Sequence, residues 1–332
     1  MTEVKKTLPE GLVFDKESFR VSTPVEIASY ISKRLRAEKV ADLGCGIGIQ
    51  TINLARESGS VIAVDIDPQR LEMCKLNCES MGLDNVKYVL GDATSKEIID
   101  EVGDVDVIHS DPSRNRVLPL SMDSLSPNPF VVYRSYKGDM CFDLPATITS
   151  DRIPHDWELE FISLRGEMKR LCAYTGNKRI YGRSAISLPS GDRIISDPKV
   201  ERKVVKAERP LRYIYDVDSS IPAASLLPEF VSSLGDMSII QEDKQRTLAT
   251  SLEPIESPFL IRRFLVVNKS GSFDDLRKAL SNLKIGKVYL RFNIDPSSYY
   301  EMKRSLEEKL KGEKNGYVFR FKNSFYVGLR EE

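Results

Sequence analysis

Lys39-Val-Ala-Asp-Leu-Gly-Cys-Gly-Ile-Gly48 is the stretch of sequence that decides the fold. A short apolar run leads into the alternate glycines Gly44, Gly46 and Gly48, and the residues from Ile49 onward have the pattern of a helix start. A strand, a glycine turn and a helix N-terminus let a ligand approach the backbone where no Cβ blocks it. Taken alone, this pattern fits any nucleotide-binding α/β domain.

Three later stretches narrow the interpretation. Each is an apolar strand pattern that ends in a polar signal: Asp65 after residues 60–64, Asp92 after residues 86–90, and Asp111-Pro112 after residues 105–110. The alternation of strands and helices predicts a parallel sheet, and the carboxyl ends of parallel strands share one edge. We therefore expect all these polar groups at the edge where open α/β sheets bind ligands.

In order and spacing, these four motifs resemble those of class I S-adenosylmethionine-dependent methyltransferases, over roughly residues 20–115. The resemblance implies a Rossmann-like, doubly wound, mostly parallel seven-stranded sheet and S-adenosyl-L-methionine as cofactor. It implies that the glycine turn lines the methionine end of the cofactor, that Asp65 takes the ribose hydroxyls and that Asp92 takes the adenine amine. The implied cofactor-binding residues are Asp42, Gly44, Cys45, Gly46, Gly48, Asp65, Ile66, Asp92, Ala93 and Asp111.

Other readings stay open for some of these residues. A nicotinamide dehydrogenase is the rival class, but its fingerprint places a third glycine where this chain has Thr51. Asp42 could serve only to orient the glycine turn, and Asp92 could form an Asx-turn. Neither His109 nor His155 is near a Ser or Cys arrangement, which disfavours a hydrolase triad.

The composition is ordinary for a globular protein. The 332 residues include 49 basic and 49 acidic side chains, so total charge makes no case for nucleic acid. The five cysteines form no C-x-x-C pair, so we expect no metal site and a reducing, cytoplasmic location. No run approaches 18 apolar residues and the N-terminus has no apolar signal region, which predicts neither membrane spanning nor secretion.

The chain divides into regions of different pattern. We expect an N-terminal arm at residues 1–22, a methyltransferase domain at 23–195, a charged linker at 196–210 and a smaller α+β domain at 211–332. Residues 213–218, 257–264 and 287–292 resemble the C-terminal module, called THUMP-like, of a group of uncharacterised methyltransferases. That resemblance implies structured RNA as substrate, because THUMP domains bind RNA on tRNA- and rRNA-modifying enzymes.

The fourth strand end carries the expected chemistry. Methyl transfer from a sulfonium is an in-line displacement, so the enzyme must mainly align the nucleophile and exclude water. The Asp111 carboxylate could accept a hydrogen bond from an exocyclic amine, with Pro112 fixing the turn. Enzymes that methylate base amines usually carry an aromatic residue shortly after this motif, and this chain has Ser113 and Arg114 instead. Enzymes that use a cysteine nucleophile on pyrimidine carbons carry a Ser-Cys-Asn-Pro motif, which is absent here.

The sequence therefore predicts an enzyme that methylates a base of tRNA or rRNA, with a guanine exocyclic amine as first choice. Candidate substrate contacts are basic and aromatic residues after the fourth strand, each equally readable as surface: Arg114, Arg116, Tyr133, Arg134 and Lys137. The alternatives are a protein or small-molecule methyltransferase, and a non-catalytic RNA-binding protein that keeps the cofactor fold.

Overall fold

The computed structural model describes residues 8–114, 121–145, 147–148, 152–201, 203–243 and 246–331. The chain divides into two compact units. Unit 1 comprises residues 1–164 and 168–196, and unit 2 comprises residues 165–167 and 197–332. The segment 197–210, which the sequence analysis expects to be a linker, clusters with unit 2, and its Lys206 forms an isolated bridge with Ile239.

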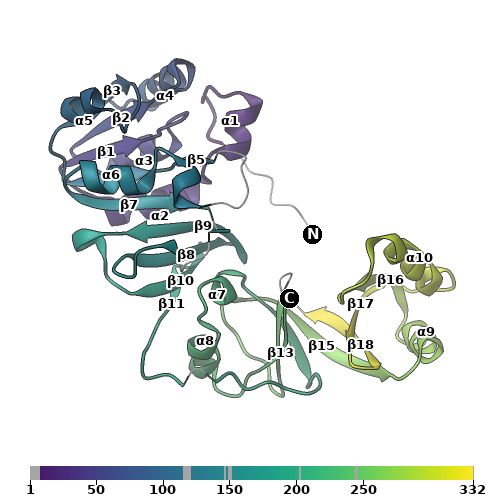
Figure 1. The fold of residues 1–332 in the computed structure, drawn as a ribbon. Helices are drawn as coiled ribbons and strands as arrows, with labels where there is room; N and C mark the ends of the chain where they lie inside the picture. Colours follow the sequence, from purple (N-terminus) through teal and green to yellow (C-terminus); the bar gives the residue numbers. More distant parts are fainter. Residues whose placement is uncertain are drawn as a thin grey trace. The chain divides into compact units, whose positions relative to one another are not determined.

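Unit 1 contains a nine-stranded sheet of order β11-β10-β8-β9-β7-β4-β1-β2-β3 (Figure 1). The five strands β3, β2, β1, β4 and β7 are parallel, and β9 runs antiparallel to β7. The strand bounds are β1 Lys39–Leu43, β2 Ser60–Asp65, β3 Val86–Leu90, β4 Val107–Ser110, β7 Asp139–Leu144, β8 Glu158–Leu164, β9 Glu167–Tyr174, β10 Arg183–Leu188 and β11 Asp192–Ile195. This confirms the mostly parallel doubly wound sheet.

Two details of the predicted sheet are wrong. It has nine strands rather than seven, because β10 and β11 extend it beyond β8. The patterns of residues 157–164 and 183–188 predict antiparallel strands, but β8 and β10 are parallel, with Ala185 beside Phe161. Both strands are buried along nearly their whole length, and period-two patterns in such strands carry no information about direction.

Helices cover both faces of this sheet (Figure 1). The bounds are α1 Lys16–Val21, α2 Val25–Leu35, α3 Ile49–Glu57, α4 Pro68–Ser80, α5 Lys96–Val102 and α6 Pro129–Ser135. Apolar side chains of α2, α3 and α4 pack on one face, where Ile31, Leu54 and Cys74 are fully or almost fully buried. The crossovers β3-α5-β4 and β4-α6-β7 run in the opposite direction across the sheet, which puts α5 and α6 on the other face.

The helix starts test the capping predictions. The sequence Asp67-Pro68 predicts a helix start, and Asp67 does cap α4, with Pro68 at the first helical position. The sequence Thr23-Pro-Val-Glu26 predicts a capping box, but this is wrong, since Pro24 is the N-cap of α2 and no side chain caps it. Thr23 Oγ1 instead accepts a hydrogen bond from Arg170 Nη2 at 2.6 Å. A tertiary contact from a distant strand has therefore replaced the local cap.

Unit 2 has a seven-stranded sheet of order β13-β14-β12-β15-β18-β17-β16. Its strands are β12 Tyr213–Val217, β13 Ser238–Glu242, β14 Thr247–Ser251, β15 Leu260–Ser270, β16 Ile285–Leu290, β17 Lys314–Phe321 and β18 Ser324–Glu331. Its helices are α7 Ser220–Ala223, α8 Leu227–Leu234, α9 Phe273–Asn282 and α10 Pro296–Glu307. The sequence patterns predict helix caps at Ser272 and Asp295 and a C-terminal hairpin, and all three are confirmed. The pattern of residues 222–234 predicts one helix, but the structure has the two short helices α7 and α8, and no pattern predicted β13 and β14.

Among the described residues, no helix is long and apolar enough to cross a membrane. All five cysteines are buried and free of disulfide bonds. The cytoplasmic location stays a prediction.

Candidate active site

A cavity of about 750 Å³ lies at the carboxyl edge of the unit 1 sheet, next to the point between β1 and β4 where the strand order reverses. Its wall contains the ends of four neighbouring parallel strands and the start of the chain before α2. The volume is in the range of ordinary ligand sites. The lining residues include Asp42, Gly44, Cys45, Gly46, Asp65, Ile66, Asp92, Ala93, His109, Asp111, Pro112 and Arg170.

The glycine turn forms the floor between β1 and α3. Gly44, Gly46 and Gly48 have φ values of +85°, +55° and +87°, which residues with a side chain rarely adopt. A Cβ on Gly44 would lie 3.1 Å from the backbone oxygen of Asp111, and one on Gly48 would lie 2.7 Å from Cys74 Sγ. A Cβ on Gly46 would meet no atom within 4 Å. Close packing therefore restricts two of the glycines, while the third leaves open backbone at the cavity.

Asp65 ends β2 and is only 8% exposed. Its Oδ2 accepts a hydrogen bond from Gly46 N at 2.8 Å, and its Oδ1 accepts one from Asp67 N at 2.9 Å. Each carboxylate oxygen has room for another donor, so both could take a ribose hydroxyl. Burial raises the pKa of the Asp65 carboxyl, and the two backbone donors oppose that rise. The next residue, Ile66, is 68% exposed beside the cavity and offers an apolar wall for a planar base.

Asp92 follows β3 and is exposed. Its Oδ1 accepts hydrogen bonds from the backbone and hydroxyl of Thr94 at 2.8 and 2.7 Å, which is the Asx-turn that the sequence analysis left open. The turn leaves Oδ2 as the atom that could accept an adenine amine. Ala93 is buried beside it, and its carbonyl accepts the Tyr136 hydroxyl at 2.7 Å.

The Asp42 carboxylate is fully buried in β1 and already has two partners. Thr51 Oγ1 donates to its Oδ2 at 2.5 Å, and His109 Nδ1 lies 2.8 Å from its Oδ1. Thr51 is also the residue that replaces the third glycine of the dehydrogenase fingerprint. Asp42 thus borders the cavity while its oxygens hold α3 and β4 in place, which favours the orienting role left open above.

His109 and Arg170 are site residues that the sequence analysis missed. His109 Nε2 faces Asp143 Oδ1 at 3.7 Å, Arg170 Nε lies 3.6 Å from Asp143 Oδ2, and Arg170 Nη2 lies 3.5 Å from Asp111 Oδ2. A series of side chains with alternating charge therefore connects the glycine turn to the end of β4: Asp42, His109, Asp143, Arg170 and Asp111. Two features of the sequence could have indicated these residues. His109 and Asp143 lie within apolar strand patterns, where a buried polar side chain needs a partner. Arg170 alternates with Cys172 and Tyr174 on one face of β9.

Three side chains of this charge series each have a buried polar atom without a hydrogen-bond partner among the described residues. These atoms are His109 Nε2, Asp143 Oδ2 and Arg170 Nε. Such atoms favour a polar ligand or water at the cavity. Cys141, Asp143 and Cys172 also place ligand-type atoms within 4.8 Å of one another, a grouping that the sequence analysis, which expected no metal, did not anticipate.

Burial and the neighbouring charges shift the pKa values of His109, Asp111 and Asp143. Burial disfavours the charged form of His109, but the Asp143 and Asp42 carboxylates outweigh it and raise the His109 pKa well above its ordinary value. Burial raises the pKa of Asp111, and Arg170 opposes that rise. Burial also acts to raise the pKa of Asp143, but His109 and Arg170 overcome it and lower that pKa. The opposite shifts of the His109 and Asp143 pKa values favour an ion pair between these two side chains.

The candidate substrate contacts do not line the described cavity wall. Tyr133 on α6 packs its ring 5.1 Å from that of Trp157, and Lys137 Nζ lies 3.9 Å from Asp104 Oδ1. Asp104 precedes β4, so Lys137 lies near the opposite, amino edge of the sheet. Arg134 is exposed on α6, and the backbone of Arg114 forms β5 with Ser113. Arg116 lies outside the described residues, and a role of any of the five in substrate binding stays a prediction.

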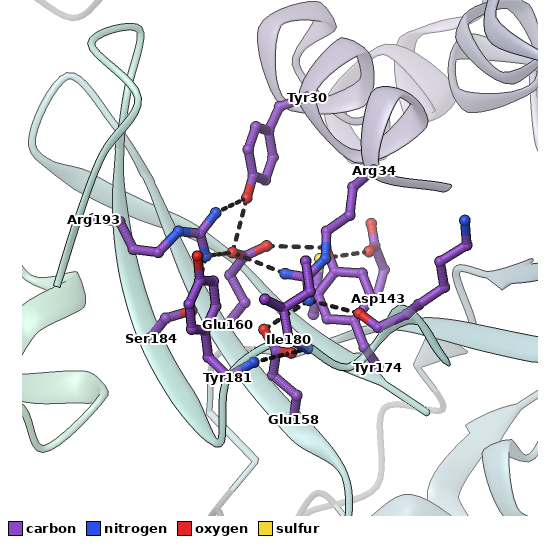
Figure 2. Close-up of polar contacts among 12 residues, drawn as sticks. Tyr30, Arg34, Asp143, Glu158, Glu160, Tyr174, Ile180, Tyr181, Ser184 and Arg193 are labelled. Carbon is purple, nitrogen blue, oxygen red and sulfur yellow. Dashed lines mark hydrogen bonds and ion pairs between the residues drawn. The ribbon is translucent and has the colours of Figure 1, made fainter. Parts of the chain in front are cut away.

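A second polar network anchors α2 at the amino edge of the sheet. Figure 2 shows Glu160 between Arg34 and Arg193, with the hydroxyls of Tyr30 and Tyr174 also directed at it. Arg34 additionally pairs with Glu158 at 2.7 Å and lies over the Tyr174 ring at 3.6 Å. Together with the Thr23–Arg170 hydrogen bond, these contacts attach both ends of α2 to the sheet that carries the site.

Parts of this chain are similar in sequence to known methyltransferases. The profile of a family described as "Methyltransferase domain" matches residues 40–118. An uncharacterized S-adenosylmethionine-dependent methyltransferase of Mycobacterium tuberculosis is 25% identical over 299 residues, which cover 86% of this chain and 79% of the relative. An uncharacterized RNA methyltransferase of Oceanobacillus iheyensis is 30% identical over 123 residues, covering 32% of this chain and 27% of the relative.

One solved structure is similar along nearly the whole chain. A crystal structure from Porphyromonas gingivalis W83, described as that of a methyltransferase, aligns with a TM-score of 0.73 and 20% identity. The alignment covers 96% of this chain and 83% of that protein. At this identity the likeness establishes the fold alone.

Proposed function

Because this chain is an S-adenosylmethionine-dependent methyltransferase, we propose that it methylates a base of a structured RNA, with a guanine exocyclic amine as the first choice of acceptor. The observation that favours an amine as the methyl acceptor is the position of the Asp111 carboxylate. It follows the fourth strand, lines the cavity beside the glycine turn and is 33% exposed. An acceptor oxygen at that place can meet an N–H of an incoming nucleophile.

The residues around the cavity fit the cofactor. Asp65 has spare acceptor capacity on both oxygens, Ile66 supplies the apolar wall, and the open backbone at Gly46 leaves space at the turn. We propose that these three residues, with Gly44, Gly48, Cys45, Asp92, Ala93 and Asp111, hold it. When bound, S-adenosylmethionine supplies a methyl group on a positively charged sulfur.

Asp111 then acts on the acceptor. Its carboxylate accepts a hydrogen bond from the amine, which raises electron density on the nitrogen, and it can take the proton that the methylated nitrogen must lose. Arg170 opposes the rise in the Asp111 pKa that burial causes, and so favours the ionised form. The guanidinium contacts one carboxylate oxygen and leaves the other for the substrate. Pro112 is buried and limits the turn that presents the carboxylate.

Two observations support RNA rather than another acceptor. One relative, from Oceanobacillus iheyensis, is described as an RNA methyltransferase. The chain also carries unit 2, a separate α+β body in the position where the THUMP-like resemblance predicts an RNA-binding module. We propose that unit 2 is that module and that tRNA or rRNA is the substrate.

The test is a methylation assay with isotopically labelled S-adenosylmethionine and unmodified tRNA and rRNA transcripts, followed by mass mapping of the product nucleotide. Label on a guanine amine supports the proposal. Cofactor binding with label only on protein or small molecules in a cell extract contradicts the RNA assignment, and RNA binding without any methylation contradicts the enzymatic one.

A further inference from the structure

Unit 2 contains three arginines that converge around too few carboxylates. Arg246 directly precedes β14, Arg262 lies in β15, and Arg291 directly follows β16. We call these three residues the arginine cluster. Strand pairing explains part of the convergence, because Asp216 on β12 is in register with Arg262 on one side and with Leu248, two residues after Arg246, on the other. Side chains two apart share a face of a strand, so Arg246 is directed to the face of Asp216.

Two of the arginines share one acid. Arg262 Nη1 lies 3.0 Å from Asp216 Oδ2, and Arg291 Nη2 contacts both Asp216 oxygens. Asp216 is only 7% exposed, so this is a partly buried ion-pair triad with two cations and one anion. The same carboxylate cannot neutralise a third guanidinium.

Arg246 is the third, and its guanidinium pairs with no carboxylate among the described residues. Asp243 is nearby, but the contact is from the Arg246 backbone N to Asp243 Oδ1 at 3.0 Å. Asp243 Oδ2 accepts the side-chain amides of Gln241 and Asn293 at 2.6 and 3.3 Å. Arg246 Nη1 and Arg291 Nε are buried without a hydrogen-bond partner in the described part of the chain.

The electrostatics agree with this geometry. Burial lowers the pKa of Arg246, and the positive charges of Arg291 and Arg262 lower it further, against the pull of Asp216 and Asp243. A half-buried cation beside two others is unfavourable unless an anion joins them. The side chains of Arg262 and Arg291 are 29% and 19% exposed, so an anion can reach the cluster from solvent.

We propose that the arginine cluster is a phosphate-binding site. Guanidinium groups match phosphate oxygens in geometry and charge, and several converging arginines are a common way to hold a phosphate. Resting on the proposed function, we assign the phosphate to the backbone of the RNA substrate, which makes the cluster an anchor on unit 2 that reads no base.

The first test uses inorganic phosphate and needs neither RNA nor cofactor. Phosphate, compared with chloride at equal ionic strength, should raise the melting temperature of the wild-type protein by about 2–4 °C at roughly ten times its Kd. Arg246→Gln should abolish this rise. Arg277→Gln is the matched control, because Arg277 is an exposed arginine on α9 that pairs with Asp274 in the same unit, and it should keep the rise.

Stability without phosphate separates a ligand site from a structural one. If Arg246 serves a ligand, Arg246→Gln should be at least as stable as wild type in chloride, because it removes an uncompensated charge. Asp216→Asn, which weakens the pairing of Arg262 and Arg291, should be less stable. A loss of stability in Arg246→Gln, or a wild-type protein that phosphate does not stabilise, overturns the site.

The second test measures tRNA binding against salt concentration. Arg246→Gln should weaken binding about tenfold at 0.1 M salt and reduce the slope of log K against log salt by about one, whereas Arg277→Gln should change Kd less than twofold. Phosphate stabilisation without any tRNA binding by wild type would overturn the RNA assignment and the proposed function while leaving the phosphate site. Unchanged tRNA binding by Arg246→Gln would overturn the cluster as an RNA anchor.

Discussion

Asp42 and His109 lie on adjacent parallel strands, and Asp42 Oδ1 is 2.8 Å from His109 Nδ1. On its other side His109 faces Asp143, and the two carboxylates raise the His109 pKa, which favours the imidazolium form. This pairing links β1 to β4 at the point where the strand order reverses. It also connects the stability of unit 1 to the protonation of one histidine.

Replacing His109 with Gln should strongly destabilise the protein. The amide removes the positive charge and leaves two buried carboxylates beside each other, a loss of about 3–5 kcal/mol. Urea unfolding monitored by circular dichroism measures it. His155→Gln is the matched control, since His155 is exposed, and it should change stability by less than about 0.5 kcal/mol. Equal stability of the two variants would contradict a charged His109.

The same histidine predicts a pH dependence. Its pKa in the folded protein is well above the ordinary value of 6.5, so its contribution is fully present below about pH 6.5 and is lost as pH rises toward the folded pKa. The gap in unfolding free energy between wild type and His109→Gln should therefore narrow from pH 6.5 to 8.5. A gap that widens over this range would mean that His109 is neutral in the folded state.

Asp65→Asn should weaken binding of S-adenosylmethionine. Hydrogen bonds to a charged acceptor contribute about 1.5–3 kcal/mol, so we expect Kd to rise roughly 10- to 150-fold. Isothermal titration calorimetry gives the value. Asp104→Asn is the control, because Asp104 is an exposed residue just before β4 at the amino edge of the sheet and does not line the cavity, and it should stay within twofold of wild type.

Asp111→Asn should reduce kcat about 10²- to 10⁴-fold, the usual range for loss of a general base. The amide keeps the shape of the side chain but cannot take a proton. Single-turnover methylation of the RNA substrate separates chemistry from binding. A variant with wild-type kcat would remove Asp111 from the mechanism.

Arg170→Gln should move the acid limb of the kcat–pH profile to higher pH. Arg170 opposes the rise in the Asp111 pKa that burial causes, so removing the guanidinium raises that pKa further. Arg179→Gln, at an exposed position on the surface, should leave the limb in place. An identical profile for all three proteins would limit Arg170 to packing.

The sequence predicted the site residues that directly follow a strand in the chain. The glycine turn, Asp65, Asp92 and Asp111 each follow a strand pattern within a few residues, and the parallel sheet brings their positions together. His109, Asp143 and Arg170 could not be found in the same way, because their partners are 27 to 67 residues away in the chain and their pairing depends on strand register. Thr23 shows the same limit. The residues around it have the pattern of a helix cap, but its hydroxyl accepts a hydrogen bond from Arg170 on a distant strand instead.

Unit 2 shows a different limit. The strands β13 and β14 were missed because residues 238–251 mix polar and apolar positions, and only pairing with β12 gives them a place in the sheet. The arginine cluster depends on that pairing as well. Its members are separated by 16 and 29 residues, which no local pattern connects (positions 246, 262 and 291).

The contact between Gly48 and Cys74 restricts how this chain can change over evolutionary time. A Cβ at position 48 would meet Cys74 Sγ at 2.7 Å, and the backbone there has a φ of +87°. A smaller residue at position 74 would relieve only the first of these barriers, so no single compensating replacement opens position 48 to other amino acids. Position 74 is restricted in turn, because a bulkier side chain would press on the turn. Among descendants of this sequence we therefore expect the glycine to persist and position 74 to vary only among small residues.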